Sequence, residues 1–432
     1  MRRVTAFGLV GAISAAACGG ECDADGDGHE AKSCGGRDCD DSDFSVHPGG
    51  KDDPFPWISE TIDEEGTVGL LAFDEAGSPQ VVYATGSSAP SVRHAFLQEG
   101  AWQIEEVFRE ADVIGVSVAS DGTLYAGLRD PGDTIHLATR SAGAWSVEEV
   151  LDLDRGSDAS LVVPGSEPLF AVVHSDDFYS FVGIAARFEE GWAVERIAEY
   201  PSWGGLDSRV HGIVGEDAAL QIAACLWGSM LLYAEQPDGW FVHELPDASC
   251  RTEFGISSAA AEGALHLAFV DRSYGIAHTT DAQGWSLEPV TPHTHSPSLA
   301  IGPDGPLVAF TDEREWTTGN IRIASRATGV FQSFRVSRDA FGGAGRGAAL
   351  AIAPDGTARI VTGSPLRLLS PAPPLDADCD GSVRMPQDAD ADGWLDAGVV
   401  APDCDDADAS VFPGAHEVIG DLVDSDCNGS DR

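Results

Sequence analysis

Residues 145–150 read WSVEEV, and this short pattern recurs along the chain at nearly constant intervals. Its aromatic residue returns at Trp57, Trp102, Trp145, Trp192, Trp240, Trp285 and, in a weaker copy, Phe331. The spacings are 45, 43, 47, 48, 45 and 46 residues. A repeat of this kind indicates one supersecondary unit that is used seven times.

A second pattern lies between the aromatic copies, most clearly in residues 298–310 (SLAIGPDGPLVAF). It combines an alternating strand, an Asp-Gly hairpin signal and a second apolar strand. A third strand precedes each aromatic pattern, for example at residues 135–139 and 321–325. Each period of about 45 residues therefore holds four short strands, which is the size of one β-propeller blade.

The two ends of the repeat array complement each other. The array begins with a lone aromatic strand at Trp57, and its last period, residues 349–369, has three strands and no aromatic pattern. The N-terminal strand can therefore complete the last blade and close the ring, which removes the exposed sheet edges. We predict an all-β protein with a seven-bladed β-propeller, flanked by irregular acidic segments of calcium-loop type. An open β-solenoid or two β-sandwiches are the alternatives.

The recurring aromatic residues have two interpretations. On an outer strand of each blade, a Trp side chain packs most simply between blades. An aromatic cage for a glycan is the alternative, but regular recurrence favours a packing role. The Glu that stands three residues after five of the six repeat Trp residues (His243 follows Trp240) points to the opposite face of the strand, where we expect it to be solvated.

The charge balance is strongly acidic. The 432 residues contain 71 Asp and Glu against 25 Lys and Arg, a formal net charge of −46, with 43% hydrophobic residues. The sequence has no basic patch to neutralise phosphates, which argues against a nucleic-acid partner, and an anionic membrane surface would be repelled. The acid is concentrated at the ends, because 27 of the 71 acidic residues lie in residues 19–53 and 375–432. The concentration of acidic residues at the two ends therefore needs an explanation other than the average solubility of the chain.

The first eighteen residues read as an export signal. Met1-Arg2-Arg3 is followed by an uncharged, mostly apolar stretch that ends Ala-Ala-Ala-Cys18. Small residues before a Cys resemble the bacterial lipobox, although Ala15 stands where Leu is usual. The resemblance implies acylation of Cys18 and, with Gly19 next, an outer-membrane anchor. An ordinary cleaved signal is the alternative.

Cysteine parity agrees with lipidation. The chain has nine Cys, and removing Cys18 leaves eight, enough for four disulfides in an oxidising compartment. Within the repeats, Cys225 and Cys250 are expected to connect the fourth blade to the fifth. Two unpaired buried thiols are the alternative.

The acidic ends have the spacing of metal-binding loops. Asp388, Asp390, Asp392 and Asp396 occupy positions 1, 3, 5 and 9 of an EF-hand-type calcium loop with Gly at position 6, although Val399 replaces the Glu of position 12. Further ligands must then come from neighbouring clusters. The remaining candidate ligands are Asp23, Asp25, Asp27, Asp38, Asp40, Asp41, Asp43, Asp376, Asp378, Asp380, Asp403, Asp405, Asp406, Asp408, Asp424, Asp426 and Asn428. Plain acidic linkers that keep the protein soluble are the alternative.

These ends resemble a known bacterial repeat. Residues 38–43 and 403–408 both follow DCDD-x-D and lead into Pro-Gly at the same offset. The order of motifs in residues 388–429 resembles the metal-binding repeat of secreted bacterial proteins named after a methanotroph copper-binding surface protein (MopE-type). Together with the lipobox, the chain resembles a myxobacterial-type lipoprotein. Despite the copper name, hard oxygen ligands favour calcium, with copper or another divalent metal as the alternative.

The N-terminal copy of the repeat stops early, at Gly50. Its missing tail, D-x-D-C-D-G, occurs at residues 376–381, after the propeller. We therefore expect the propeller to be inserted within the first repeat, since the ends of a closed ring emerge close together. With the resemblance, this implies disulfides Cys39–Cys379 and Cys404–Cys427 and leaves Cys22 and Cys34 as the remaining pair.

These interpretations define the expected organisation. Residues 1–18 form a signal peptide with lipobox, 19–53 the first part of the N-terminal repeat, 54–371 the propeller and 372–432 the C-terminal repeats. We expect a lipoprotein, on the periplasmic or the cell-surface face of the outer membrane, whose flanks bind calcium. Its propeller would bind a glycan or protein or serve a structural role.

The alternative function is a propeller enzyme. A sialidase-like glycosidase or a lyase acting on extracellular polysaccharide would use carboxylates at strand ends, such as Asp130, Asp176, Asp271 and Asp312. Their repetition points instead to turn chemistry, and we assign no catalytic residue.

Overall fold

The computed structural model describes most of the repeat region and scattered positions of the flanks. It covers residues 57–372 except 87–89, 154–156, 176–178, 202–207, 216–218, 252–254, 262, 273–274, 284, 292–293, 313–319, 327–330, 337–347 and 364. In the flanks it describes residues 29, 32–34, 36–37, 39, 379, 404–405, 407–408, 410–411, 423 and 425. No helix among these residues is long and apolar enough to cross a bilayer.

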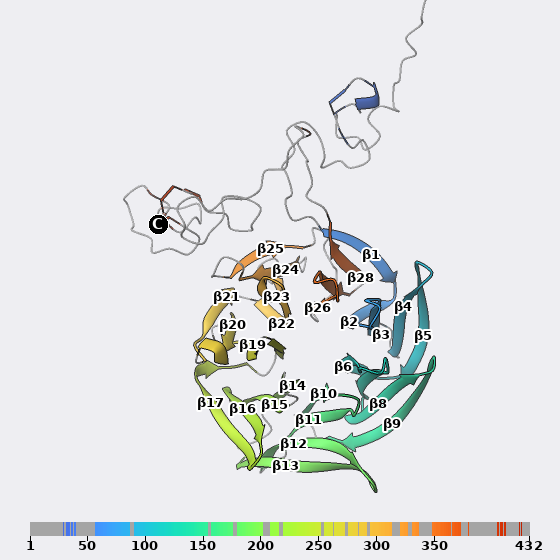
Figure 1. The fold of residues 1–432 in the computed structure, drawn as a ribbon, viewed down its shortest axis with the longest axis vertical. Helices are drawn as coiled ribbons and strands as arrows, with labels where there is room; N and C mark the ends of the chain where they lie inside the picture. Colours follow the sequence, from blue (N-terminus) through green and yellow to red (C-terminus); the bar gives the residue numbers. More distant parts are fainter. Residues whose placement is uncertain are drawn as a thin grey trace, which may run out of the picture. The chain divides into compact units, whose positions relative to one another are not determined.

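The described strands form seven antiparallel sheets of four strands, arranged as the blades of a ring (Figure 1). Blade 1 consists of β2 (Gly66–Phe73), β3 (Pro79–Thr85), β4 (Ser91–Gln98) and β5 (Ala101–Arg109), and blade 2 of β6 (Asp112–Val118), β7 (Leu124–Arg129), β8 (Thr134–Ser141) and β9 (Ala144–Asp152). Blade 3 consists of β10 (Asp158–Val162), β11 (Leu169–Ser175), β12 (Tyr179–Phe188) and β13 (Gly191–Pro201), and blade 4 of β14 (Arg209–Val214), β15 (Leu220–Leu226), β16 (Ser229–Gln236) and β17 (Gly239–Ser249). The predicted all-β, seven-bladed propeller is confirmed.

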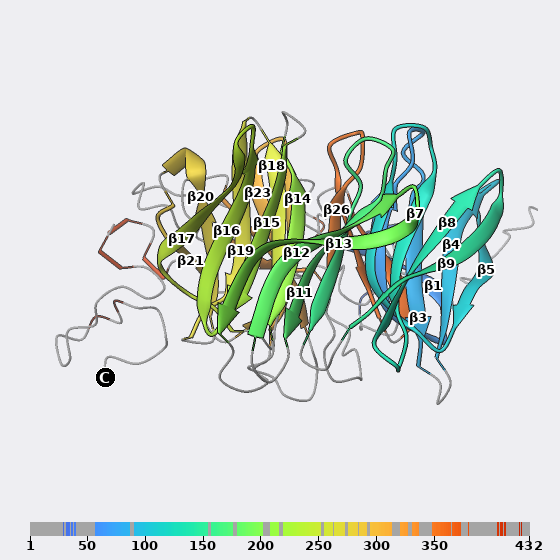
Figure 2. The same cartoon turned by 90° about the horizontal axis from the view of Figure 1, so that it is seen from below.

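The remaining blades complete the ring. Blade 5 consists of β18 (Ile256–Ala261), β19 (Ala264–Val270), β20 (Ile276–Thr280) and β21 (Glu288–Thr291), and blade 6 of β22 (Thr294–Gly302), β23 (Gly305–Asp312), β24 (Asn320–Ser325) and β25 (Gln332–Arg335). Blade 7 consists of β26 (Ala349–Ile352), β27 (Ala358–Thr362), β28 (Leu366–Pro371) and β1 (Trp57–Asp63). Two short 3-10 turns, η1 (Lys32–Cys34) and η2 (Asp281–Gln283), are also described. The strands run between two faces that carry the loops (Figure 2).

The ring closes through its first strand. β1 pairs antiparallel with β28, so that Trp57 lies opposite Pro371 and Ser59 opposite Leu369. Blade 7 thus combines three strands from the end of the array with one from its beginning. This is the closure predicted from the lone first strand and the three-stranded last period of the sequence repeat. The pairing covers the edge of β28, which would otherwise be exposed.

The hydrophobic core lies between neighbouring blades. Second strands such as β3 and β11 are buried on both faces, which explains their continuous apolar sequences. The largest fully buried side chains include Tyr83, Phe170, Phe269 and Phe310, all on second strands. Burial of such a side chain stabilises the fold by about 1.5–3 kcal/mol.

The innermost strands, the first of each blade, contact one another around the axis of the ring. Their free edges leave backbone N–H groups without a strand partner, and side-chain oxygens of the neighbouring blade accept several of them. Ser257 Oγ accepts from Leu299 N at 2.8 Å, and Ser298 Oγ accepts from Leu350 N at 2.9 Å. These serines occupy corresponding positions in two repeats. The repeat therefore encodes a contact between blades as well as strands.

Candidate metal-binding flanks and the propeller channel

Only two of the predicted metal ligands, Asp405 and Asp408, are among the described residues. The others lie outside them: Asp23, Asp25, Asp27, Asp38, Asp40, Asp41, Asp43, Asp376, Asp378, Asp380, Asp388, Asp390, Asp392, Asp396, Asp403, Asp406, Asp424, Asp426 and Asn428. The predicted lipidation site, Cys18, also lies outside the described residues. No group of three or more His, Cys, Asp and Glu side chains suited to a metal occurs in the described part of the chain.

The described part of the second DCDD-x-D motif forms two consecutive turns. Asp408 N donates to Asp405 O at 2.9 Å, and Val411 N donates to Asp408 O at 2.8 Å. Asp408 Oδ1 also accepts bonds from Ser410, from N at 3.1 Å and from Oγ at 2.7 Å. These bonds hold the pKa of the exposed Asp408 carboxyl below its ordinary value. The donors described here are oxygens, which suit a hard cation such as calcium.

The four flank cysteines that the structure describes are all in disulfides. Cys39 is joined to Cys379 across a separation of 340 residues, with a Cα–Cα distance of 5.6 Å. Cys34 and Cys404 are also disulfide-bonded. The predicted Cys39–Cys379 bridge is therefore confirmed. The partners predicted for the other two, Cys22 and Cys427, lie outside the described residues.

The chain divides into two compact units, and the division agrees with a split first repeat. One unit contains residues 1–56 and 373–386, and the other contains residues 57–372 and 387–432. The first unit thus combines segments from before and after the propeller, and Cys39–Cys379 lies within it. This is the arrangement that the missing tail of the N-terminal motif predicts.

The disulfide inside the repeats is also present. Cys225, on β15, is bonded to Cys250, just after β17, with a Cα–Cα distance of 5.9 Å. Cys250 forms an isolated bridge with Asp271 of blade 5. The disulfide therefore fixes the segment that leads from blade 4 to blade 5, as predicted.

The recurring Trp and Glu residues form contacts between blades. Trp102 Nε1 donates to Glu60 Oε1, and Trp145 Nε1 donates to Glu105 Oε1, each at 2.8 Å. Glu105 also accepts from Arg140 Nε at 2.6 Å. The packing interpretation of these Trp residues is supported. The expectation of solvated Glu side chains is wrong for Glu105, because this side chain reaches Arg140 and Trp145 of the next blade.

The strand-end carboxylates serve turns, where their side chains are described. Asp130 Oδ1 accepts the backbone N–H groups of Gly132 and Thr134, at 2.8 and 3.0 Å. Asp271 Oδ1 accepts from Gly275 N at 3.2 Å. The side chains of Asp176 and Asp312 lie outside the described residues. The turn interpretation is therefore supported for Asp130 and Asp271.

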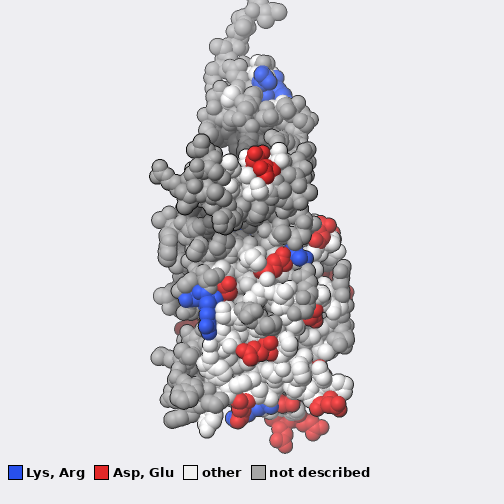
Figure 3. Space-filling view, turned by 90° about the vertical axis from the view of Figure 1, so that its left-hand side faces the viewer, with Lys and Arg blue, Asp and Glu red and all other residues white. Residues whose placement is uncertain are grey.

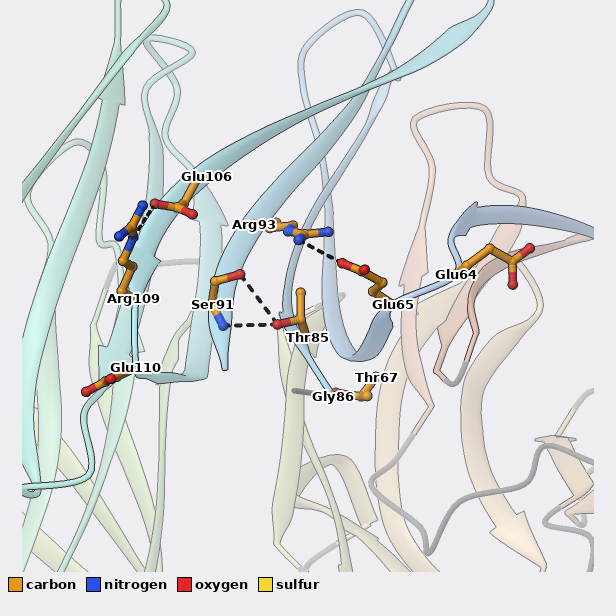
Figure 4. A pocket seen from close by; sticks show the side chains of 10 residues that line it. All are labelled: Glu64, Glu65, Thr67, Thr85, Gly86, Ser91, Arg93, Glu106, Arg109 and Glu110. Atoms are coloured by element: carbon orange, nitrogen blue, oxygen red, sulfur yellow. Dashed lines mark hydrogen bonds and ion pairs between the residues drawn. The ribbon is translucent and has the colours of Figure 1, made fainter. Parts of the chain in front are cut away.

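A pocket of about 710 Å³ lies where blade 7 meets blade 1 (Figure 4). Both arginines of its lining are paired with a carboxylate, Arg93 with Glu65 at 2.9 Å and Arg109 with Glu106 at 2.8 Å. Glu64 and Glu110 point away from this group at opposite ends of the pocket. The lining carboxylates therefore do not converge on one position.

A larger cavity, about 1060 Å³, follows the axis of the ring and is lined by the innermost strands of all seven blades. We call it the channel. Its lining charges come from consecutive blades 2 to 4 and include Arg129, Asp133, Asp158 and Arg209. Figure 3 shows, for comparison, the outer surface on one side, where acidic side chains are scattered and basic ones are few. The sequence repeats gave no signal for these four charged residues, because they do not recur from blade to blade.

Comparison with known proteins adds a motif and a fold. A family model described as "Putative metal-binding motif" (Cu-binding_MopE) matches residues 38–53 and 403–431. No curated protein matches the chain. The chain is therefore a seven-bladed β-propeller that carries this metal-binding motif at both ends.

Several solved structures are similar in fold. AofleA from Arthrobotrys oligospora is 12% identical, with 66% of this chain and 91% of that chain covered and a TM-score of 0.44. The SapL1 lectin in complex with alpha methyl fucoside is 11% identical, with 65% and 98% covered and a TM-score of 0.45. TolB from Acinetobacter baumannii is 15% identical, with 73% and 66% covered and a TM-score of 0.40. Such low identities and TM-scores carry no functional information.

Proposed function

We propose that this chain is an exported lipoprotein whose flanks bind calcium and whose propeller recognises an extracellular glycan or protein. The metal-binding motif at both ends is the observation that carries the proposal. Calcium is the preferred ion because the motif offers carboxylates, which are the ligands of hard cations. The chain has only 3 Met and 12 His, so the softer ligands favoured by copper are scarce.

The role of the metal follows from the charge of the flanks. Carboxylates packed this densely repel one another, and a bound divalent cation would offset that repulsion. The side chains available for it are the Asp residues of the DCDD-x-D and D-x-D-x-D-G patterns. Asp408, whose backbone is fixed by two turns, presents its carboxylate at the surface. Calcium would thus order the acidic segments on either side of the propeller.

A metal titration of the mature chain tests this proposal. Calorimetry and thermal melts should show calcium binding and a rise of the melting temperature, both reversed by a chelator. The variant Asp408→Asn should weaken calcium binding. A matched control is Asp121→Asn, because Asp121 is also an exposed turn residue but lies on the propeller, where its Oδ1 accepts from Thr123 N at 2.9 Å. No response across millimolar calcium, or preferential binding of copper, would refute the calcium assignment.

The anchor is tested separately. The variant Cys18→Ala should shift the protein from the membrane fraction to the soluble exported fraction and abolish labelling by fatty acid. Protease treatment of intact cells then distinguishes the cell-surface from the periplasmic face. If the wild-type chain carries no lipid, an ordinary cleaved signal is the correct alternative.

A further inference from the structure

One corner of the channel combines four polar side chains from two neighbouring innermost strands. β10 of blade 3 contributes Asp158 and Ser160, and β14 of blade 4 contributes Arg209 and His211. Residues two apart on a strand share a face, so each pair is directed to the same side of its strand. All four residues line the channel.

Asp158 is held in place by contacts on both sides. Its Oδ2 accepts from Val210 N at 3.0 Å, which connects it to blade 4. On the other side, Arg129 of blade 2 donates to the carbonyl of Ser157 at 3.2 Å and is itself paired with Asp133. Burial raises the pKa of Asp158, although Arg209 and Arg129 oppose that shift. The corner is therefore preorganised by three blades.

The hydrogen bonds of Ser160 define the state of His211. Ser160 Oγ accepts from Gly212 N at 3.3 Å, so its own proton is free to be donated to His211 Nδ1, 3.4 Å away. Burial lowers the pKa of His211 to about 4, so the imidazole is neutral at physiological pH. With Nδ1 as the acceptor, the proton of the neutral ring is on Nε2. Among the described residues, no acceptor contacts that N–H group.

Arg209 also has donors to spare. The only hydrogen bond of its guanidinium within the described part of the chain runs from NH1 to the carbonyl of Ser208, at 3.4 Å. A guanidinium carries five N–H donors, and partly buried donors normally find acceptors. Arg209 and His211 therefore present unused donors from one strand to the same part of the channel.

We propose that this corner binds the carboxylate of an acidic sugar, with Arg209 and His211 as the donors. The inference rests on the proposed glycan recognition by the propeller and specifies its site and ligand class. A guanidinium matches the two oxygens of a carboxylate. Asp158 and Asp133 nearby disfavour a dianion such as sulfate. The hydroxyl groups of Ser257 and Ser298, whose oxygens already accept N–H bonds, can donate to sugar hydroxyls in the channel.

The channel volume suits such a ligand. Small-molecule sites measure about 300–1,000 Å³, and the channel, at about 1060 Å³, is slightly larger than the upper end of that range. Phe, Tyr and Trp side chains are absent from the described lining, so the proposed recognition relies on hydrogen bonds and charge rather than on stacking against a large aromatic ring.

Calorimetry on the mature full-length chain tests the site, with D-glucuronate as the probe and D-glucose and inorganic sulfate as comparison ligands. Glucuronate should bind and the other two should bind at least about tenfold more weakly. Arg209→Gln should reduce glucuronate affinity by at least about tenfold. Asp158→Asn should leave it unchanged or raise it, because Asn still accepts the Val210 N–H bond while a repulsive charge is removed. Arg196→Gln is the control, since Arg196 is exposed on β13 and paired with Glu199.

The outcomes separate this inference from the proposed function. Failure of glucuronate to bind, equal binding of glucose, or equal affinity of Arg209→Gln and wild type would each overturn the site. Asp158→Asn is expected to keep or gain affinity, so a general loss of folding cannot imitate the result. If a glycan array shows binding of neutral glycans only, glycan recognition stands and this site is wrong. The calcium response of the same sample reports on the flanks independently.

Discussion

The indole Nε1 of Trp145 donates a 2.8 Å hydrogen bond to Glu105, which belongs to the preceding blade. Glu105 also interacts with His94 of its own blade, at 2.9 Å, and with Arg140 of the next. A comparable contact joins Glu288 of blade 5 to Arg326 of blade 6 at 2.9 Å. Each of these Glu residues stands three positions after an aromatic repeat residue, so the repeat builds its own blade-to-blade connection.

Removal of this connection should destabilise the propeller. In Glu105→Ala, the buried His94 and the donors of Trp145 and Arg140 lose their acceptor. We expect a loss of about 2–4 kcal/mol in the free energy of unfolding, measured by denaturant titration. The matched control is Glu195→Ala, the same repeat position on blade 3, where the side chain is exposed and the loss should stay within about 0.5 kcal/mol. Equal losses in both variants would contradict a specific role of Glu105.

The same contact predicts a pH dependence. Burial alone would raise the pKa of Glu105, but hydrogen bonds from His94, Arg140 and Trp145 lower it below its ordinary value of 4.5. A lowered pKa in the folded state contributes stability above the unfolded pKa, and this contribution is lost as pH falls through the folded pKa. The difference in unfolding free energy between wild type and Glu105→Gln should therefore be constant above about pH 5 and shrink below about pH 4.5. A difference that stays constant into strong acid would rule out this linkage.

The Cys39–Cys379 bridge should stabilise the chain through its unfolded state. It closes a loop of 340 residues that contains the whole propeller. The chain-entropy relation gives about 6 kcal/mol for a loop of this length, and measured effects are often smaller. The double variant Cys39→Ser/Cys379→Ser should lower the unfolding midpoint while the circular dichroism of the native propeller stays the same. A midpoint equal to that of wild type would show that the bridge does not constrain the unfolded ensemble.

Closure of the ring through β1 can be tested by truncation. A chain that begins at residue 66 lacks β1 and leaves the edge of β28 unpaired, with the buried Leu366, Leu368 and Leu369 nearby. We expect oligomers or aggregates in size-exclusion chromatography, because exposed strand edges pair with other chains. A chain that begins at residue 54 keeps β1 and lacks Cys39 as well, so it isolates the effect of the strand. Monomeric behaviour of both chains would show that β1 is dispensable for closure.

Much of the fold could be predicted because the propeller repeats its local signals. Period, strand pairs and the complementary ends identify seven blades and the closing role of Trp57. The Cys39–Cys379 bridge was also predictable, since the motif that lacks a tail and the isolated tail each carry one Cys. The metal ligands could be named for a similar reason, because calcium-loop spacing lies within a few consecutive residues.

Other features could not be predicted from the repeat. Glu105 looked solvated because strand periodicity gives the face of a side chain but not what covers that face. Whether Glu105 meets Arg140 or water depends on how far blade 2 lies from blade 1. The corner at Asp158 and Arg209 gave even less signal, because neither residue recurs in the other blades.

The amino-acid sequence by itself thus determined the number of blades, their strand order, the ring closure and the positions of the acidic motifs. These properties follow from hydrophobic periodicity and short-range spacing, which are local along the chain. Only the tertiary structure decided that Glu105 accepts from Trp145, and that Arg209 and His211 share a channel corner with Asp158 and Ser160. Such contacts join residues about one blade apart, and they depend on the strand register and on the angle between neighbouring blades.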